Sequence, residues 1–348
     1  MSAELLRARL PGLRLPSVSL CGAETPIERA EAGDRGGARL WVKREDLAGT
    51  VYGGNKVRKL EWILPDVAAR GGELLTLGGV GSNYLVAAAL YGPAHGVSLR
   101  AVVFPQPDTE HARQNAALLN TYAASVTPAG SMVGLPWAGL KALIAGRRAG
   151  RPWPSFVWAG GTGALGDLGW VAGALEIEAQ VKAGLLPPPT DLFVPVGSGG
   201  TAVGLTLGLG LTSLPTRVHG VRVVEGAFIS PTALRWLGEA TARRLRDAGA
   251  DCPPYDPARL VLHDGVIGAG YGHPTPAGEA ARAFARGSLG LTLDPTYTGK
   301  ALACCLEWMA TAQRGSNVLF INTYSSRHPE LSLEALRHPL TGLLTPFE

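Results

Sequence analysis

The sequence predicts an α/β fold built from doubly wound layers, in which helices pack on open sheets. Segments with the length and apolar content of strands alternate with segments of helical periodicity along most of the 348 residues. Residues 191–196 form a continuous apolar strand that runs into a glycine-rich turn and then into a helix. With 46% apolar and 17% charged residues, the chain can bury one large core or two ordinary ones.

Composition and charge exclude several classes of function. The net charge is only +4 and no long basic run occurs, so neither a nucleic acid nor a membrane is an expected partner. The four cysteines include no C-x-x-C pair, which favours a reducing, cytoplasmic compartment, and we expect no metal site. Arginines and prolines interrupt residues 1–20, which we expect to be irregular and to hold neither a signal peptide nor a membrane span.

The first half of the chain is expected to begin with a tethering segment at residues 25–28. Strands are expected at residues 39–43, 73–77, 99–104 and 123–126, and helices at residues 56–70, 84–95 and 109–120. The first helix contains Pro65, which removes a backbone hydrogen bond and is expected to bend or split it. Residues 150–156, rich in proline and tryptophan, are expected to connect two lobes.

The second half continues the alternation. Strands are expected at residues 191–196, 218–224 and 317–321, and a strand end at residues 291–300 that enters a helix. Further helices are expected at residues 168–182, from residue 202 onward, and at residues 230–250 and 276–287. The helix after residue 300 carries Cys304 and Cys305 among alanines and leucines, where packing is favoured over metal or redox chemistry.

Lys56 is the first residue that points to chemistry. Gly53 and Gly54 let the backbone pass close to a flat ligand and bring this lysine to the start of an apolar-periodic helix. The chain keeps only six lysines against 26 arginines. An amine held in a dry pocket can lose its proton and form a Schiff base with a carbonyl ligand such as pyridoxal phosphate. The alternative is a solvated lysine at a helix start.

Two glycine-rich turns can receive an anion. Residues 78–83, Gly-Gly-Val-Gly-Ser-Asn, lie between a strand and a helix whose free N–H groups face the turn. A simpler interpretation is that Ser82 or Asn83 only caps the helix. Residues 197–201, Gly-Ser-Gly-Gly-Thr, form a second nest, suited to a phosphate. With Glu225 they also fit a dinucleotide fingerprint, but that fingerprint normally follows the first strand of its domain, so the phosphate nest is favoured.

Several motifs recur in the order and spacing of a known enzyme family. They are Lys43-Arg44-Glu45-Asp46, Gly53-Gly54-Asn55-Lys56, Gly81-Ser82-Asn83, the loop of residues 197–201, Gly270-Tyr271-Gly272, residues 293–300 and Phe320-Ile321-Asn322-Thr323. Over nearly its whole length the chain resembles the 1-aminocyclopropane-1-carboxylate (ACC) deaminase and D-cysteine desulfhydrase family. The resemblance implies a fold type II, tryptophan synthase β-like pyridoxal phosphate enzyme and a homodimer. It also implies two doubly wound open-sheet domains with the cofactor between them, a large one of residues 1–60 and 159–348 and a small one of residues 61–158.

The resemblance implies how the cofactor is held. Lys56 would bind pyridoxal phosphate as a Schiff base and, once freed by the substrate, shuttle the α-proton. Asn83 would bond the ring hydroxyl of the cofactor, and Tyr297 would stack near its pyridine ring. The phosphate would lie in the loop formed by Gly197, Ser198, Gly199, Gly200 and Thr201.

The resemblance also implies the substrate side of the site. Ser82, with backbone amides near Asn83 and Tyr84, would bind the substrate carboxylate, and Tyr271 would face the substrate. Tyr84 and Tyr324 would add two phenols at the pocket, which could narrow it or supply a proton donor.

Residue 298 separates the two activities that name the family. The deaminase branch carries a glutamate there to keep the pyridine nitrogen protonated, whereas this chain has Thr298. A neutral partner, Thr298 or Thr323, leaves the ring a weaker electron sink, which favours β-elimination from a small amino acid over opening a cyclopropane ring. The products would be a keto acid and ammonia, with sulfide if the substrate is D-cysteine.

The chain departs from the family pattern around the substrate. Gly81 stands where a glutamine is common, Tyr84 where a histidine or glutamine is common, and residues 322–325 read Asn-Thr-Tyr-Ser in place of His-Thr-Gly-Gly. The substrate and its enantiomer therefore stay open. The alternatives are ACC deaminase-like ring opening, β-replacement or racemisation on the same scaffold, and a catalytically inert protein that binds pyridoxal phosphate.

Overall fold

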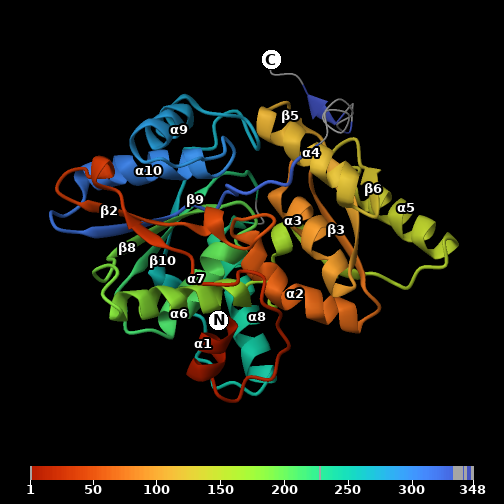
Figure 1. Cartoon of the computed structure of the whole chain (residues 1–348), viewed down its shortest axis with the longest axis horizontal. Helices are drawn as coiled ribbons and strands as arrows, with labels where there is room; N and C mark the ends of the chain where they lie inside the picture. Colours follow the sequence, from red (N-terminus) through yellow and green to blue (C-terminus); the bar gives the residue numbers. More distant parts are fainter. Residues whose placement is uncertain (1, 227–228, 332–339, 341–342, 346–348) are drawn as a thin grey trace.

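The computed structural model of the chain describes residues 2–226, 229–331, 340 and 343–345. Its strands form two main sheets, one on each side of Figure 1. The larger sheet has the order β1 (Ile27–Arg29), β2 (Arg39–Lys43), β11 (Asn317–Ile321), β8 (Asp191–Val196), β9 (Arg217–Arg222) and β10 (Leu260–His263). The smaller has the order β6 (Ser125–Pro128), β4 (Ser98–Phe104), β3 (Glu73–Gly79) and β7 (Ser155–Val157). Within these two sheets, β1 runs antiparallel to β2 and all other pairs are parallel.

Helices cover both faces of each sheet. On the larger sheet, α1 (Ser2–Arg9), α6 (Leu168–Lys182), α7 (Gly200–Gly210) and α8 (Pro231–Asp247) lie on one face, and α9 (Pro276–Ser288) and α10 (Thr298–Thr311) on the other (Figure 1). On the smaller sheet, α2 (Lys56–Ala69), α3 (Asn83–Tyr91) and α4 (Glu110–Tyr122) lie on one face and α5 (Leu135–Arg148) on the other. Along β8, Leu192 and Val194 pack towards α6 and α7, whereas Phe193 packs towards α10. This is the doubly wound α/β architecture that the sequence predicts.

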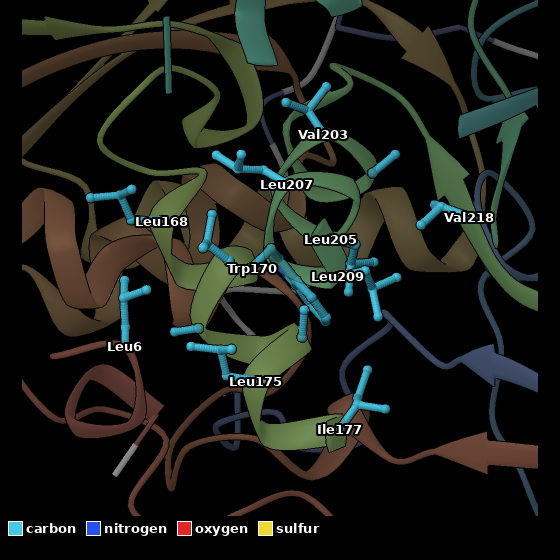
Figure 2. Packing of buried hydrophobic residues seen from close by; sticks show 14 of the residues in the cluster. Leu6, Leu168, Trp170, Leu175, Ile177, Val203, Leu205, Leu207, Leu209 and Val218 are labelled. Carbon is cyan, nitrogen blue, oxygen red and sulfur yellow. The ribbon is translucent and has the colours of Figure 1, made fainter. Parts of the chain in front are cut away.

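The contact between α6 and α7 fixes the loop that precedes α7. Figure 2 shows side chains of both helices, including Trp170 and Leu207, in one buried cluster. A Cβ atom at Gly204 would lie 2.7 Å from the Cβ of Trp170, and one at Gly208 would lie 2.6 Å from the Cβ of Ala174. Because carbon atoms do not pack that closely, only glycine fits at both positions. The close packing sets the N-terminal end of α7 beside the start of α6.

The elements β2, β8, β11 and α6 have the predicted boundaries. Pro65 was expected to bend or split the first helix; the split is wrong, because α2 continues through this residue. A proline at this position leaves the carbonyl four residues earlier without its helical partner, and that carbonyl, of Glu61, accepts the N–H of Val18 at 2.9 Å. The N-terminal segment therefore compensates for the missing bond.

Several other secondary-structure elements differ from those predicted. Residues 1–20 are not irregular throughout, because α1 docks Leu6 into the core beside α6. The helix expected at residues 84–95 ends at Tyr91, and Pro93 opens a separate 3₁₀ turn. Residues 291–297 form a loop rather than a strand end, because the carboxylate of Asp294 accepts backbone N–H groups of its own segment. α5, β7 and β10 were not predicted.

The two sheets are formed by different parts of the chain, which can be compared with the predicted domain boundaries. Strands of the smaller sheet come from residues 73–157, and those of the larger sheet from residues 27–43 and 191–321. α2 crosses residue 60 without a break, so the boundaries at residues 60 and 158 stay a prediction. No helix in the described ranges is long and apolar enough to cross a membrane.

Candidate functional site

Five loops carry most of the predicted site residues; three follow the carboxyl ends of parallel strands, and two that begin helices contact them. They are residues 53–56, which begin α2, residues 78–83 after β3, residues 197–200 after β8, residues 294–298 before α10 and residues 322–325 after β11. This edge is where open α/β sheets bind their ligands. The site therefore draws on segments from the two sheets.

The loop before α2 holds Lys56 rigidly. The N–H of Asn55 donates to the carbonyl of Thr323 at 3.2 Å, its side chain donates to the hydroxyl of Thr201 at 2.9 Å, and its carbonyl accepts the indole N–H of Trp170 at 3.1 Å. Gly54 has a φ of +89°, and a Cβ atom there would lie 2.8 Å from the oxygen of Thr323. The glycine is required by both the conformation and the close approach.

The environment of Lys56 favours the neutral amine. Burial is the largest cause and the charge of Lys59 the second, and together they lower the pKa of Lys56 to about 7, with Asp167 acting in the opposite direction. Lys56 and Ser198 both approach Gly160. A Cβ atom at Gly160 would lie 3.4 Å from Nζ of Lys56 and 2.5 Å from Oγ of Ser198. The amine is thus placed beside the 197–200 loop, where it can act as a nucleophile near neutral pH. The side chain of Lys56 is partly buried and lies beside this loop, which disfavours the alternative of a fully solvated lysine.

The 197–200 loop forms a concave nest at the start of α7. Gly199 has a φ of +89°, and α7 begins at the next residue, so successive backbone N–H groups point into the loop. The ring of Tyr297 lies 2.9 Å from where a Cβ of Gly197 would be. Ser198 and Thr162 share a hydrogen bond of 2.6 Å. Because Gly197 and Gly199 carry no side chains, the loop has room for a bulky anion next to the ring of Tyr297.

Sequence reasoning missed a buried ion pair beside this nest. Lys59 is fully buried, and its Nζ lies 3.3 Å from Asp167 and 3.1 Å from the hydroxyl of Thr162. A Cβ atom at Gly200 would lie 2.5 Å from the same Nζ, so the cation faces the start of α7. Burial lowers the pKa of Lys59 and raises that of Asp167. The scarcity of lysine was the available signal, since Lys43, Lys59 and Lys300 are all buried.

The turn after β3 places Ser82 and Asn83 differently. Oγ of Ser82 accepts the N–H of Leu85 at 3.5 Å, so this serine does cap α3. Asn83 is no cap: its Oδ1 accepts the hydroxyl of Tyr52 at 2.9 Å and the amide of Asn115 at 2.8 Å. Because its oxygen accepts from two donors, the Nδ2 of Asn83 is the atom left to donate to a ligand.

A glutamine fills the space beside the same turn. Oε1 of Gln106, in β5 (Gln106–Pro107), accepts the N–H of Gly81 at 3.0 Å. A Cβ atom at Gly81 would lie 2.8 Å from its Nε2, and one at Gly79 would collide with its Oε1. β5 pairs with β12 (Leu344–Thr345), which fixes its backbone. Sequence reasoning missed Gln106 because no motif links residue 106 to the turn.

Tyr271 and Tyr297 form a pair of phenols on the other side of the turn. Their hydroxyl groups lie 2.7 Å apart, and burial raises the pKa of both. The segment of Tyr297 is held by Asp294, whose carboxylate accepts the N–H of Tyr297 at 2.6 Å and the hydroxyl of Thr298 at 2.7 Å. The hydroxyl of Thr298 is therefore engaged within its own loop. Thr323 contributes its carbonyl to the loop of Lys56.

Tyr84 and Tyr324 occupy different borders of the site. Tyr84 is buried with its ring against Gly161, and its hydroxyl has no hydrogen-bond partner within the described ranges. Tyr324 lies edge-on against the ring of His111, with centroids 5.2 Å apart. Tyr84 is thus next to the loop that contacts Lys56, and Tyr324 is next to the first turn of α4.

The sequence matches a known family of enzymes along most of its length. Residues 18–323 match the family model of the pyridoxal-phosphate dependent enzymes. The chain is 30% identical over 319 residues to a D-cysteine desulfhydrase of Klebsiella pneumoniae, covering 89% of this chain and 94% of the relative. A D-cysteine desulfhydrase of Salmonella newport is likewise 30% identical over 321 residues, covering 89% of this chain and 94% of that relative.

Solved structures are similar as well. A crystal structure described as an ACC deaminase homologue superposes with a TM-score of 0.75 at 28% identity, covering 92% of this chain and 94% of that one. A pyridoxal 5'-phosphate-dependent aspartate racemase superposes with a TM-score of 0.60 at 15% identity, covering 90% of this chain and 92% of that one. At that identity the likeness concerns the fold alone.

Proposed function

Because this chain belongs to the pyridoxal-phosphate dependent enzymes, and among them to the ACC deaminase and D-cysteine desulfhydrase family, we propose that it is a lyase that eliminates the β-substituent of a small amino acid. The favoured substrate is D-cysteine, and the products are a keto acid, ammonia and sulfide. The observation that carries this proposal is the position of Lys56 beside the 197–200 loop, where burial lowers the pKa of its amine to about 7, a value that suits a group exchanging a proton at neutral pH.

The residues around Lys56 fit pyridoxal phosphate. The nest at the start of α7, with Gly197, Ser198, Gly199, Gly200 and Thr201, suits the phosphate, and the buried amine of Lys59 lies beside it. The ring of Tyr297 supplies a flat face, and Nδ2 of Asn83 supplies a donor for the ring hydroxyl. We place the cofactor between a large domain of residues 1–60 and 159–348 and a small domain of residues 61–158.

The proposed chemistry depends on how these residues handle protons and charge. When bound, pyridoxal phosphate supplies an electron sink that stabilises the charge left at Cα after a proton leaves. Lys56 holds the cofactor and, once free, takes the α-proton at its Nζ. The hydroxyl of Ser82 and the backbone amides at the start of α3 bind the substrate carboxylate. Tyr271, through its hydrogen bond to Tyr297, faces the β-substituent.

The partner of the pyridine nitrogen supports elimination over ring opening. The hydroxyl of Thr298 donates to Asp294, so Thr323 is the better candidate for this partner. Either group is a neutral hydroxyl, which leaves the cofactor a weaker electron sink than a carboxylate partner would. Expulsion of a β-leaving group requires less charge delocalisation than opening a cyclopropane ring.

The test is an assay of the purified protein loaded with pyridoxal phosphate. D-cysteine, L-cysteine and ACC are offered separately, and keto acid, ammonia and sulfide are measured. Sulfide and pyruvate from D-cysteine support the proposal. Keto acid from ACC would indicate ring opening, inversion of configuration a racemase, and a new β-substituted amino acid a replacement enzyme. No change in the cofactor spectrum with any amino acid would indicate an inert binding protein.

We also propose that the protein is a homodimer. The large apolar side chains that are exposed concentrate at residues 132–158, and they include Trp137, Trp153, Phe156 and Trp158. Exposed apolar surface of this kind is usually covered in an assembly. Sedimentation equilibrium of the full chain tests the proposal, and a single species of 36.2 kDa would contradict it.

A further inference from the structure

Asn115 is a buried asparagine in the middle of α4 that contacts the turn after β3. Its side chain is fully buried. Its Nδ2 lies 2.9 Å from the carbonyl oxygen of Gly81 and 2.8 Å from Oδ1 of Asn83. An amide nitrogen carries two hydrogens, and both are therefore donated to this turn. Asn115 thus joins the backbone of the turn to the side chain of Asn83.

The carbonyl of Gly81 fixes the orientation of the Asn115 amide. Because a carbonyl oxygen only accepts hydrogen bonds, the atom of Asn115 that faces it must be the nitrogen. This carbonyl is held in place, since it shares a planar peptide unit with the N–H of Ser82, which donates to the carbonyl of Gly79 at 2.9 Å. The backbone of the turn therefore sets which end of the Asn115 amide is the donor.

Asn115 in turn fixes the orientation of the Asn83 amide. Because a nitrogen of Asn115 faces Asn83 at 2.8 Å, the atom of Asn83 that meets it must be the acceptor, Oδ1. The hydroxyl of Tyr52 also bonds this Oδ1, at 2.9 Å, but a hydroxyl can donate or accept and would suit either orientation. Of these two contacts, it is the one with Asn115 that leaves Nδ2 of Asn83 for a ligand.

We propose that Asn115 is a positioning residue, which makes Asn83 present a hydrogen-bond donor, and not an acceptor, to the ring hydroxyl of pyridoxal phosphate. The inference rests on the proposed function, in which Asn83 bonds this hydroxyl. A donor stabilises the ionised form of the hydroxyl and lowers its pKa, whereas an acceptor oxygen in the same place would raise it. Asn115 therefore acts on the charge of the cofactor through Asn83.

The test replaces the donor of Asn115 with an acceptor of the same size. The carboxyl group in Asn115→Asp supplies at most one hydrogen, whether or not it is protonated, where the amide supplies two. The fixed carbonyl of Gly81 takes that hydrogen if it is present, so Asn83 turns its Nδ2 towards residue 115 and presents Oδ1 to the cofactor. We expect the pKa that governs the visible absorbance of the holoenzyme to rise by about 1 pH unit, and the dissociation constant of pyridoxal phosphate to rise about tenfold, the value of one hydrogen bond.

Three comparisons separate this role from a structural one. Asn115→Leu removes the hydrogens without adding an acceptor, so the rise in pKa should be smaller than in Asn115→Asp. In Asn83→Ala the amide that Asn115 orients is absent, so adding Asn115→Asp should shift the pKa no further. Asn120→Asp adds the same carboxyl group on an exposed part of α4 and should leave the absorbance as in wild type.

An unchanged pKa in both Asn115 variants would overturn the inference. A larger rise in Asn115→Leu than in Asn115→Asp, or equal shifts with and without the Asn83 amide, would also overturn it and indicate a purely structural role. If Asn115→Asp does not fold, Asn115→Leu replaces it in the comparison with Asn83→Ala. Absorbance and cofactor affinity are measured without turnover. A holoenzyme that releases no keto acid but shows these shifts would therefore refute the proposed lyase function and retain the inference.

Discussion

The hydroxyl oxygens of Tyr271 and Tyr297 lie 2.7 Å apart, with the two rings nearly perpendicular at 70°. Tyr271 comes from the loop before α9 and Tyr297 from the loop before α10. Since one hydroxyl must donate to the other, the pair presents a single free proton to the site. Burial raises the pKa of both phenols, so this proton stays in place at neutral pH.

The paired hydroxyls should therefore act as one unit in catalysis. Tyr271→Phe and Tyr297→Phe are each expected to lower kcat/KM about tenfold, because each removes one member of the bond. The double variant should lose much less than the product of the single losses, since both break the same interaction. Tyr255→Phe is the matched control, because Tyr255 is also buried but packs in the core beside α8. Multiplicative losses would show that the two hydroxyls work independently.

Lys56 should capture the cofactor only as the neutral amine. Because the pKa of Lys56 is lowered to about 7, the rate at which cofactor-free protein binds pyridoxal phosphate should rise as the pH passes through about 7 and level off above it. The recovery of visible absorbance measures this rate. Lys56→Ala should recover no such absorbance and retain almost no turnover.

The charge of Lys59 sets part of this pH dependence. It lowers the pKa of Lys56, so Lys59→Met should raise that pKa and move the midpoint of cofactor capture to higher pH. Lys182→Met is the control, since Lys182 is an exposed lysine on α6. A midpoint that moves down in Lys59→Met, or moves equally in both variants, would contradict this account.

Local sequence patterns identified some of the segments that form the candidate site, whose roles stay a prediction. Residues 191–196 were identifiable because both faces of β8 are buried and every residue is therefore apolar or paired. The loop of Lys56 was identifiable from its paired glycines. Lys59 and Gln106 could not be found in the same way, because each contacts the candidate site through a segment distant in sequence. Such contacts leave no spacing pattern along the chain.

The helix α1 likewise depends on a contact with a distant segment, so the local sequence did not predict it. Arg7 and Arg9 make residues 1–20 look polar and irregular, yet Leu6 is fully buried and Arg9 pairs with Glu178 of α6. The helix is stabilised by a tertiary contact, and eight residues alone are too short for a stable helix.

Breaking the buried ion network of Lys43, Glu45, Arg58 and Glu176 should be costly to stability. Glu176 binds Lys43 at 2.7 Å and Arg58 at 2.8 Å, and Arg58 also binds Glu45 at 2.7 Å, all in the interior. Glu176→Ala should lower the free energy of unfolding by about 3–5 kcal/mol, because it leaves cations buried without a partner. Asp66→Ala, which removes an exposed pair, should cost at most about 0.5 kcal/mol. Urea denaturation at pH 7 compares them.

The same network predicts how stability depends on acid. Contacts with Arg58 and Lys43 outweigh the effect of burial and lower the pKa of Glu176 to about 2 from an ordinary value of 4.5. A carboxylate with a lowered folded-state pKa stabilises fully above its unfolded pKa and loses this contribution as the pH falls. The difference in unfolding free energy between wild type and Glu176→Ala should therefore be constant above about pH 5 and shrink towards pH 2. A difference that grows on acidification would contradict this assignment.

Gly54 offers the sharpest test of how the loop places Lys56. Its φ of +89° costs a side-chain-bearing residue about 1–2 kcal/mol, and a Cβ atom would also lie 2.8 Å and 3.0 Å from the carbonyl oxygens of Thr323 and Tyr324. Gly54→Ala should therefore lose both stability and bound cofactor. Gly96→Ala is the matched control, because Gly96 has a φ of +70° but no atom within 4 Å of its Cβ position. It should lose only the conformational cost and keep its visible absorbance. Equal absorbance in both variants would mean that the close approach of Gly54 to the 322–325 segment does not position Lys56.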